Sequence, residues 1–212
     1  MNLPAKIKTI KNSAEFKLKE KGSLFLCICE PVQTEEETLN FLTKIRKQYY
    51  DATHHCYSYK FQNGVFKYSD DGEPTGTAGI RIYNAQNHFE ATNILTVVVR
   101  YFGGTKLGVG PLGKAYYDSV TECLGKSLIE EKELFHKIEL SYDFALSKTV
   151  HHFVSKFKLI IHKNDFDIRP KMICLVRPSS EKDFATELIS ASQNKVAITK
   201  TGEFSYITLG SI

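Results

Sequence analysis

Two runs of nearly continuous apolar residues stand out in the first half of the chain. Residues 24–29 (LFLCIC) and 93–102 (NILTVVVRYF) are apolar at almost every position, which indicates strands buried on both faces of a sheet. Aromatic and β-branched residues also fill 53–61, and the Asn63-Gly64 pair after them predicts a hairpin turn. We therefore expect a sheet whose central strands are covered on both sides.

Helical spacing of apolar residues follows these strands. Thr34 with Glu37 three residues later has the sequence of a capping box, and a second helix is expected over 78–88. Pro111 suits the first turn of a third helix. The apolar stripe of the first helix is predicted to be Leu39, Leu42, Ile45 and Tyr49, and that of the third to be Leu112, Ala115, Tyr116, Val120 and Leu124.

Beyond Gly125 the order of predicted elements becomes β-α-β-β-α-β. A strand is expected over 134–144, and Ser147 is predicted to cap the helix after it. Strands near 159–168 and 172–176, a helix around Phe184 and strands near 196–199 and 204–209 complete the set. This is the split-βαβ, ferredoxin-like order. The fold class is therefore α+β, with domains expected at 1–130 and 131–212.

Composition and charge are ordinary for a folded protein. The 212 residues are 42% hydrophobic and 25% charged. The net charge of +4 divides into +2 for residues 1–130 (16 Lys and Arg, 14 Asp and Glu) and +2 for residues 131–212 (12 and 10). Neither half is basic enough to identify a nucleic-acid-binding domain from charge alone.

Cysteine usage and hydropathy indicate which cellular compartment we expect for the protein. The cysteines form no CxxC pair, which argues against a disulfide framework or a zinc knuckle, so we expect free thiols, a reducing cytoplasm and neither metal nor cofactor. They are Cys27, Cys29, Cys56, Cys123 and Cys174. The start of the chain lacks the apolar run of a signal peptide, and no apolar run approaches the ~20 residues that span a membrane. We expect no membrane association.

The segment from Arg100 to Lys114 is the main candidate site. A buried strand runs into a glycine-rich loop and then into a helix N-terminus, where exposed N–H groups and the helix dipole favour an anion. Lys106 could add positive charge. A tight strand-to-helix turn that needs positive φ angles would have the same composition, and both interpretations stay open. The residues expected to bind are Arg100, Gly103, Gly104, Lys106, Gly108 and Lys114.

Two further segments carry titratable side chains. The carboxylates of Asp70, Asp71 and Glu73 could bind a divalent cation, although an acidic turn is the favoured interpretation. They could also pair with Arg100 or Lys106 and hold the glycine loop in place. On a strand, His54 and Cys56 share one face. A structural role for that pair is favoured over a nucleophile or a metal site.

Together these segments resemble the YigZ/IMPACT family, most strongly over residues 20–125 and more weakly over 133–201. The motifs are Asp51-Ala52-Thr53-His54 with Cys56, Ser69-Asp70-Asp71-Gly72-Glu73-Pro74 with Gly76-Thr77-Ala78-Gly79, Val99-Arg100-Tyr101-Phe102-Gly103-Gly104 with Lys106-Leu107-Gly108, and Ala115-Tyr116. The resemblance implies a ribosomal-protein-like β-α-β first domain, of the type of the fourth domain of elongation factor G. It also implies a ferredoxin-like second domain.

The resemblance implies a link to translation. The protein is expected to bind RNA, ribosome phosphates or a translation-regulatory protein through the glycine loop. Asp70, Asp71, Glu73, His54 and Thr77 would support that loop. The alternative is an enzyme acting on a phosphorylated small molecule or nucleotide at the same loop, with Asp70 or Asp71 as metal ligand or base. We favour a binding protein, because no nucleophile, base and oxyanion donors converge in the sequence.

One departure from the family pattern affects the loop. Relatives usually have Gly-Gly-Leu-Val-Arg where this chain has Gly110-Pro111-Leu112-Gly113-Lys114. Lys114 keeps the positive charge but lacks the two-pronged hydrogen bonding of arginine. Pro111 removes one N–H that could have met an anion.

Overall fold

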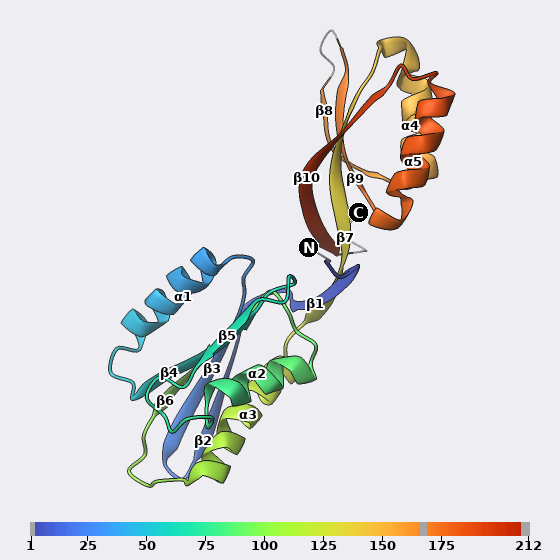
Figure 1. Ribbon diagram of the computed structural model, residues 1–212. Helices are drawn as coiled ribbons and strands as arrows, with labels where there is room; N and C mark the ends of the chain where they lie inside the picture. The colour runs from blue at the N-terminus through green and yellow to red at the C-terminus, as the bar shows by residue number, and fades with distance from the viewer. Residues whose placement is uncertain (1–2, 166–168, 209–212) are drawn as a thin grey trace. The chain divides into compact units, whose positions relative to one another are not determined.

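The computed structural model describes residues 3–165 and 169–208, an α+β protein with two five-stranded sheets and, in these residues, five α-helices (Figure 1). The chain divides into two compact units, residues 1–131 and 132–212. Strand β1 (Lys6–Ile10) hydrogen-bonds to β7 (Ile129–Ser141), whose first residues belong to the first unit. The described residues contain no helix that is both long and apolar enough to cross a membrane.

The first unit is an antiparallel sheet covered by helices on both faces. Its strands lie in the order β2-β3-β6-β4-β5. Helices α2 and α3 cover one face and α1 covers the other (Figure 1). The elements are β2 (Ala14–Glu20), β3 (Ser23–Pro31), α1 (Glu35–Gln48), β4 (His54–Lys60), β5 (Phe66–Ser69), α2 (Gly79–His88), β6 (Ile94–Tyr101) and α3 (Val109–Gly125).

The central strands are buried on both faces, as the apolar runs predicted. Phe25, Cys27 and Cys29 of β3 pack in the cluster under α2 and α3. Leu26 and Ile28, which alternate with them, pack in the cluster under α1. All five are at most 3% exposed. Burial on both sides removes more apolar surface from water than a half-exposed strand would, and this strand therefore anchors both layers.

Helix α1 begins at the predicted cap. The N–H of Glu37 donates to Thr34 Oγ1 over 3.1 Å, and the Glu37 carboxylate accepts the N–H of Gln33. The predicted stripe was wrong at Leu39, which is 62% exposed. Thr38 occupies the buried face instead, because its hydroxyl donates to the Thr34 carbonyl over 3.0 Å and is therefore satisfied in the interior.

The second unit contains the predicted β-α-β-β-α-β order of elements. Its strands lie in the order β10-β7-β9-β8, and α4 and α5 pack together over one face (Figure 1). After β7 the elements are α4 (Ser147–Lys156), β8 (Ile160–Asp165), β9 (Lys171–Val176), α5 (Pro178–Ala191) and β10 (Ala197–Thr208). Tyr142, Phe184 and Met172 are among the fully buried residues of its core.

Two details of the second unit differ from the sequence prediction. Ser147 is the first residue of α4 rather than its cap, because a short 3₁₀ turn (Phe144–Leu146) precedes it and its hydroxyl donates to Phe144. The two strands expected near 196–199 and 204–209 are one long strand, β10, with an irregularity between Lys200 and Phe204. Positions 166–168 and 209 of the predicted strands lie outside the described residues.

The Thr34 cap gives a direct test of how α1 begins. We expect Thr34→Ala to lower the free energy of unfolding by about 1 kcal/mol, because the Glu37 N–H loses its acceptor. Thr43→Ala is the matched control, since Thr43 is an exposed mid-helix threonine and alanine favours helix there. Urea unfolding followed by circular dichroism measures both. Equal losses in the two variants would contradict the capping role.

Candidate functional site

A buried ion pair lies beneath the glycine-rich loop. Arg100 at the end of β6 is 5% exposed, and Glu73 in the turn after β5 is 8% exposed. Arg100 Nη1 donates to Glu73 Oε1 over 2.5 Å. The hydroxyl of Tyr116 on α3 donates to the same carboxylate oxygen over 2.8 Å. Three segments that are far apart in the sequence therefore meet at one carboxylate.

Aromatic rings enclose the guanidinium. The centre of the Arg100 guanidinium lies 5.2 Å from the Phe25 ring centroid and 5.7 Å from that of Phe102. Cations above ring faces are stabilised electrostatically. Burial raises the pKa of the Tyr116 hydroxyl well above its ordinary value, so this group stays protonated and donates to Glu73. The network is thus arranged around one fixed pair of opposite charges.

Ser23 connects the ion pair to the loop. Its hydroxyl oxygen accepts from Arg100 Nη2 over 3.4 Å and from the Gly103 N–H over 3.2 Å. The backbones of Gly103 and Gly22 are so close that a Cβ on Gly103 would lie 1.9 Å from the Gly22 carbonyl carbon. Glycine at 103 is therefore required by this close approach.

His54 and Cys56 pack against the same network. His54 Nε2 lies 3.7 Å from Glu73 Oε2, and His54 Nδ1 lies 2.8 Å from the Asp71 carbonyl oxygen. The Cys56 thiol lies 3.0 Å from the Asp70 carbonyl oxygen and 3.3 Å from the Tyr116 hydroxyl. Burial raises the pKa of this thiol well above its usual value, which disfavours the thiolate that a nucleophile needs. These contacts fit the favoured structural role.

The acidic turn organises the start of α2. The Asp70 carboxylate accepts the N–H groups of Gly76, Ala78 and Gly79 over 2.8–3.0 Å. Asp71 accepts the N–H of His55 over 2.7 Å and pairs with Arg46. Both carboxylates are thus engaged with the protein itself. They fit the acidic-turn interpretation better than a divalent cation site.

Thr77 is also engaged within the turn. Its hydroxyl donates to the Pro74 carbonyl over 2.6 Å, and its exposed fraction is 1%. Thr77, Asp70 and Asp71 thus bond within or beside the turn that contains Glu73, and His54 lies next to the Glu73 carboxylate. Their expected role in supporting the loop stays a prediction.

The loop itself, residues 102–110, faces solvent. Every residue of it is exposed except Leu107. Gly104 and Gly108 both have φ of +83°, which favours glycine, and Gly108 precedes α3 without a capping side chain. Within residues 3–165 and 169–208, the structure gives no hydrogen-bond acceptor to the backbone N–H groups of residues 104–110. The loop thus offers a run of unpaired amides at a helix N-terminus.

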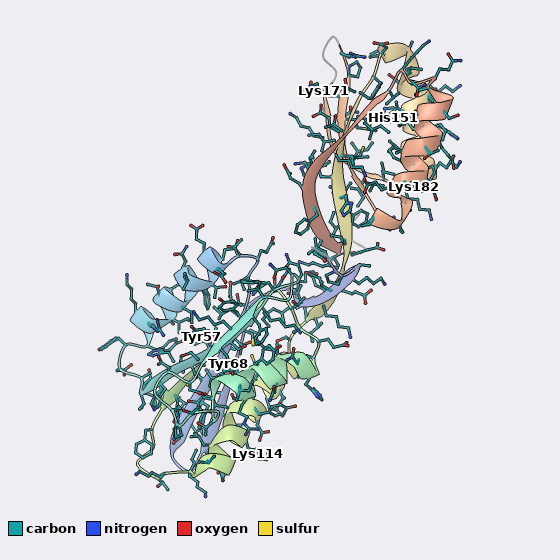
Figure 2. The ribbon with its side chains drawn as sticks, in the orientation of Figure 1. Tyr57, Tyr68, Lys114, His151, Lys171 and Lys182 are labelled. Carbon is teal, nitrogen blue, oxygen red and sulfur yellow. The ribbon has the colours of Figure 1, made fainter. Side chains whose placement is uncertain are left out.

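Two lysines beside these amides have no ionic partner in the described part of the chain. Lys106 lies in the loop, and Lys21 lies in the turn whose Gly22 touches Gly103. Lys114 on α3 is exposed (Figure 2) but pairs with Asp118, and that hydrogen bond raises the pKa of the lysine. The positive charge at the loop therefore comes mainly from Lys21 and Lys106.

The expected binding residues divide into two groups. The exposed group is Gly103, Gly104, Lys106, Gly108 and Lys114, whereas the Arg100 side chain lies in the interior. Arg100 Nη1 and Nη2 donate to Glu73 and Ser23, whereas its buried Nε has no hydrogen-bond partner among the described residues, and its expected role as a binding residue stays a prediction. Ser23, Lys21 and Tyr116 were missed as parts of the site. The pairing of Leu24 with Tyr101 across β3 and β6 brings the first two to the loop, and no sequence motif announces that register.

The buried Arg100–Glu73 ion pair predicts that neutralising one of its charges strongly destabilises the protein. Glu73→Gln should lower the free energy of unfolding by about 3 kcal/mol, because Arg100 would stay buried without a counter-charge. Glu122→Gln, which breaks an exposed pair with Lys126, should cost less than about 1 kcal/mol. Chemical unfolding of both variants measures the difference. Similar small losses would show that the Arg100–Glu73 pair contributes little to stability.

The close approach of two backbones predicts opposite effects at two glycines. Gly103→Ala should destabilise by about 3 kcal/mol, because its Cβ forces the Gly22 backbone to move. Gly110→Ala meets no atom within 4 Å and should stabilise α3 by up to about 1 kcal/mol. Melting temperatures of the two variants test this contrast. A stable Gly103→Ala protein would contradict the packing described.

Comparisons with known proteins place this chain in a family. Residues 21–124 match the Impact N-terminal domain. The chain is 30% identical over 201 residues to the IMPACT family member YvyE of Bacillus subtilis, covering 94% of this chain and 92% of that protein. It is 34% identical over 116 residues to the IMPACT family member YigZ of Escherichia coli, covering 53% of this chain and 57% of that one.

A solved structure supports the fold over nearly the whole chain. It is titled as the crystal structure of a hypothetical protein, and it matches with a TM-score of 0.68 at 23% identity. The match covers 93% of this chain and 98% of the other. The motifs around the Arg100–Glu73 pair lie within the matched domain, and the chain belongs to the IMPACT family.

Proposed function

We propose that this protein is a translation-linked regulatory protein that binds RNA phosphates through the loop of residues 102–114. The observation that carries the proposal is the run of N–H groups at 104–110 without an acceptor in the described residues, in a loop that is exposed at every residue except Leu107. Backbone amides at a helix N-terminus attract anions, since the helix dipole adds to their own partial charges. Glycines at 104 and 108 let a phosphate oxygen approach the backbone closely.

Charge around the loop favours the same partner. Lys21 and Lys106 form no ion pair among the described residues, so both remain available to phosphates. Asp118 partly neutralises Lys114, which makes it a weaker contact. A basic loop of this size gives modest affinity that depends on salt. This expectation agrees with the mild net charge of +4.

The buried network gives the loop a fixed shape. Arg100, Ser23 and Gly103 are joined by hydrogen bonds directly beneath the exposed amides. A loop that is already ordered loses less conformational entropy on binding than a flexible one. In the proposal, Arg100 positions the loop and does not touch RNA.

Family membership supports the link to translation. The YigZ/IMPACT resemblance implies translational regulation, and a protein of Dictyostelium discoideum named Protein IMPACT homolog is 38% identical over 95 residues. We favour RNA over a protein partner because lysines and free amides complement phosphate oxygens. Phe102 and Val109 are exposed apolar side chains of the loop, but two such side chains are too few to form the apolar core of a protein interface.

No observation among the described residues specifically favours the alternative that the protein is an enzyme. It would use Asp70 or Asp71 as a metal ligand or base. Asp70 already accepts three backbone N–H groups, and Asp71 accepts the N–H of His55 and pairs with Arg46. Freeing either carboxylate would leave buried or half-buried donors unpaired, which costs free energy.

The finer fold assignment belongs to the same proposal. We infer that the second unit is a ferredoxin-like domain, since its element order and its strand order β10-β7-β9-β8 agree with that arrangement. The first unit would be of the ribosomal-protein type found in the fourth domain of elongation factor G. A cytoplasmic setting agrees with translation and with the five free thiols.

The proposal predicts salt-dependent RNA binding that needs two lysines. A fluorescently labelled single-stranded RNA should bind at low salt, and log K should fall linearly with log salt concentration. The double variant Lys21→Ala/Lys106→Ala should flatten that slope by about 1.4, the value for two lost phosphate contacts on a single strand. Fluorescence anisotropy over a salt series measures both quantities.

The control variant is Lys44→Ala/Lys47→Ala. It removes the same charge from exposed positions of α1 and should leave the slope nearly unchanged. An absence of RNA binding at low salt, or equal loss in both double variants, would contradict the proposed site. Capture of a single protein partner that survives nuclease would instead favour a protein-binding adaptor.

A further inference from the structure

Three cysteines that are scattered in the sequence converge in the core of the first unit. Cys27 and Cys29 share one face of β3, and Cys123 lies in the last turns of α3. Their sulfur atoms all lie within 4.8 Å of one another. Their exposed fractions are 0%, 0% and 2%. Among the described residues, this is the one group of three or more His, Cys, Asp or Glu side chains close enough to hold a common ion.

The spacing suits an atom bound by three sulfurs. Cys27 Sγ and Cys29 Sγ are 3.9 Å apart. A pyramidal three-sulfur centre with bonds of about 2.3 Å, the length of a zinc–thiolate bond, needs sulfurs roughly 3.5 Å apart, which is slightly closer than this pair. Bonds from sulfur to other soft elements have similar lengths. Only small side-chain movements would be needed to bring Cys123 to the same distance.

The side chains around the three cysteines decide which chemical element the cluster can bind. The cluster lies among apolar side chains of β3, β6, α2 and α3. The hydroxyl oxygen of Thr96 lies 3.5 Å from Cys29 Sγ. Burial raises the pKa of Cys27, and the neighbouring Cys123 raises that of Cys29. The two thiols lower the pKa of Cys123.

Charge disfavours the commoner soft metals at this cluster. Three thiolates around a monovalent copper ion leave two negative charges in the core, and around a divalent zinc ion they leave one. Uncompensated charge in an apolar interior is costly. Zinc also prefers four ligands, and among the described residues no fourth His, Cys, Asp or Glu side chain lies close enough to complete the set. A trivalent centre with three thiolates is neutral.

We propose that Cys27, Cys29 and Cys123 form a three-sulfur binding site for trivalent arsenic. Arsenous acid, As(OH)₃, is neutral at physiological pH and reacts with three thiols. Each S–H proton leaves with one hydroxide as water, and three As–S bonds replace three As–O bonds. No electron is transferred, so no oxidant or reductant is needed. The product buries no net charge and ties β3 covalently to α3.

Access to the site requires a local opening. Cys123 lies two residues before Gly125, where α3 ends, and helix ends open more readily than helix centres. Binding should therefore be slow and should proceed faster under mildly destabilising conditions. Once formed, the cross-link should raise the melting temperature, because only the folded chain brings three thiols together.

The test is native mass spectrometry of the full chain incubated with sodium arsenite and a phosphine reductant. We expect one adduct with the mass of one arsenic atom less three hydrogens. Arsenic X-ray absorption on the same sample should show three sulfur neighbours and no oxygen. The melting temperature should rise with arsenite.

Single variants distinguish the cluster from ordinary thiol reactivity. Cys27→Ala, Cys29→Ala and Cys123→Ala should each lose the three-sulfur adduct, with circular dichroism checking that the fold persists. Cys174→Ala, which removes a buried cysteine of the second unit, should keep it. The proposal is overturned by no adduct after both native incubation and refolding with arsenite, by mixed sulfur and oxygen coordination, or by an adduct that survives Cys123→Ala.

Discussion

The Arg100–Glu73 ion pair joins the parts of the first unit that carry its most distinctive sequence. Glu73 belongs to the acidic turn, Arg100 to the end of a central strand, and Tyr116 to the helix after the glycine loop. Separating two buried charges would leave each without compensation, at a cost of several kcal/mol. The turn, the strand and the helix therefore move as one body, and the loop between strand and helix inherits a fixed shape.

Under the proposed function, this rigidity would let a loop rich in glycine serve as a binding surface. Glycines at 104 and 108 adopt left-handed backbone conformations, which would cost other residues steric strain. Ser23 fixes the start of the loop through the Gly103 N–H, and α3 fixes its end. Between these two anchors, the amides of residues 104–110 point to no acceptor in the described structure. In the proposed function, these amides are held in an ordered loop, donate to no group of the described residues and are therefore available to an external anion.

Local sequence patterns predicted the helices and strands well. The candidate site was harder to predict, because it depends on contacts between segments that are far apart in the sequence. Continuous apolar runs identified β3 and β6, and Thr34 with Glu37 identified the start of α1. The sequence also raised an acid–arginine pairing, which the structure contains as Glu73–Arg100. It did not reveal that this pairing hides Arg100, because burial at a strand end depends on which turn packs over it.

The cysteines illustrate the same limit. Spacing along the chain gave no metal motif, yet strand alternation places Cys27 and Cys29 on one face and helix packing brings Cys123 to them. Leu39 and Ser147 were misplaced for local reasons, since a satisfied threonine and a short 3₁₀ turn took their expected positions. Contacts between residues a hundred positions apart require the sheet register, which no short window of sequence contains.

The most direct measurement of the central claim is a nuclear magnetic resonance titration of the isotope-labelled chain with single-stranded RNA. The account predicts that the largest shifts occur at the backbone amides of residues 104–110, with the Arg100 guanidinium signals nearly unchanged. Shifts that leave these amides silent and gather elsewhere, or a strong response of Arg100 itself, would contradict a rigid loop held over a buried ion pair.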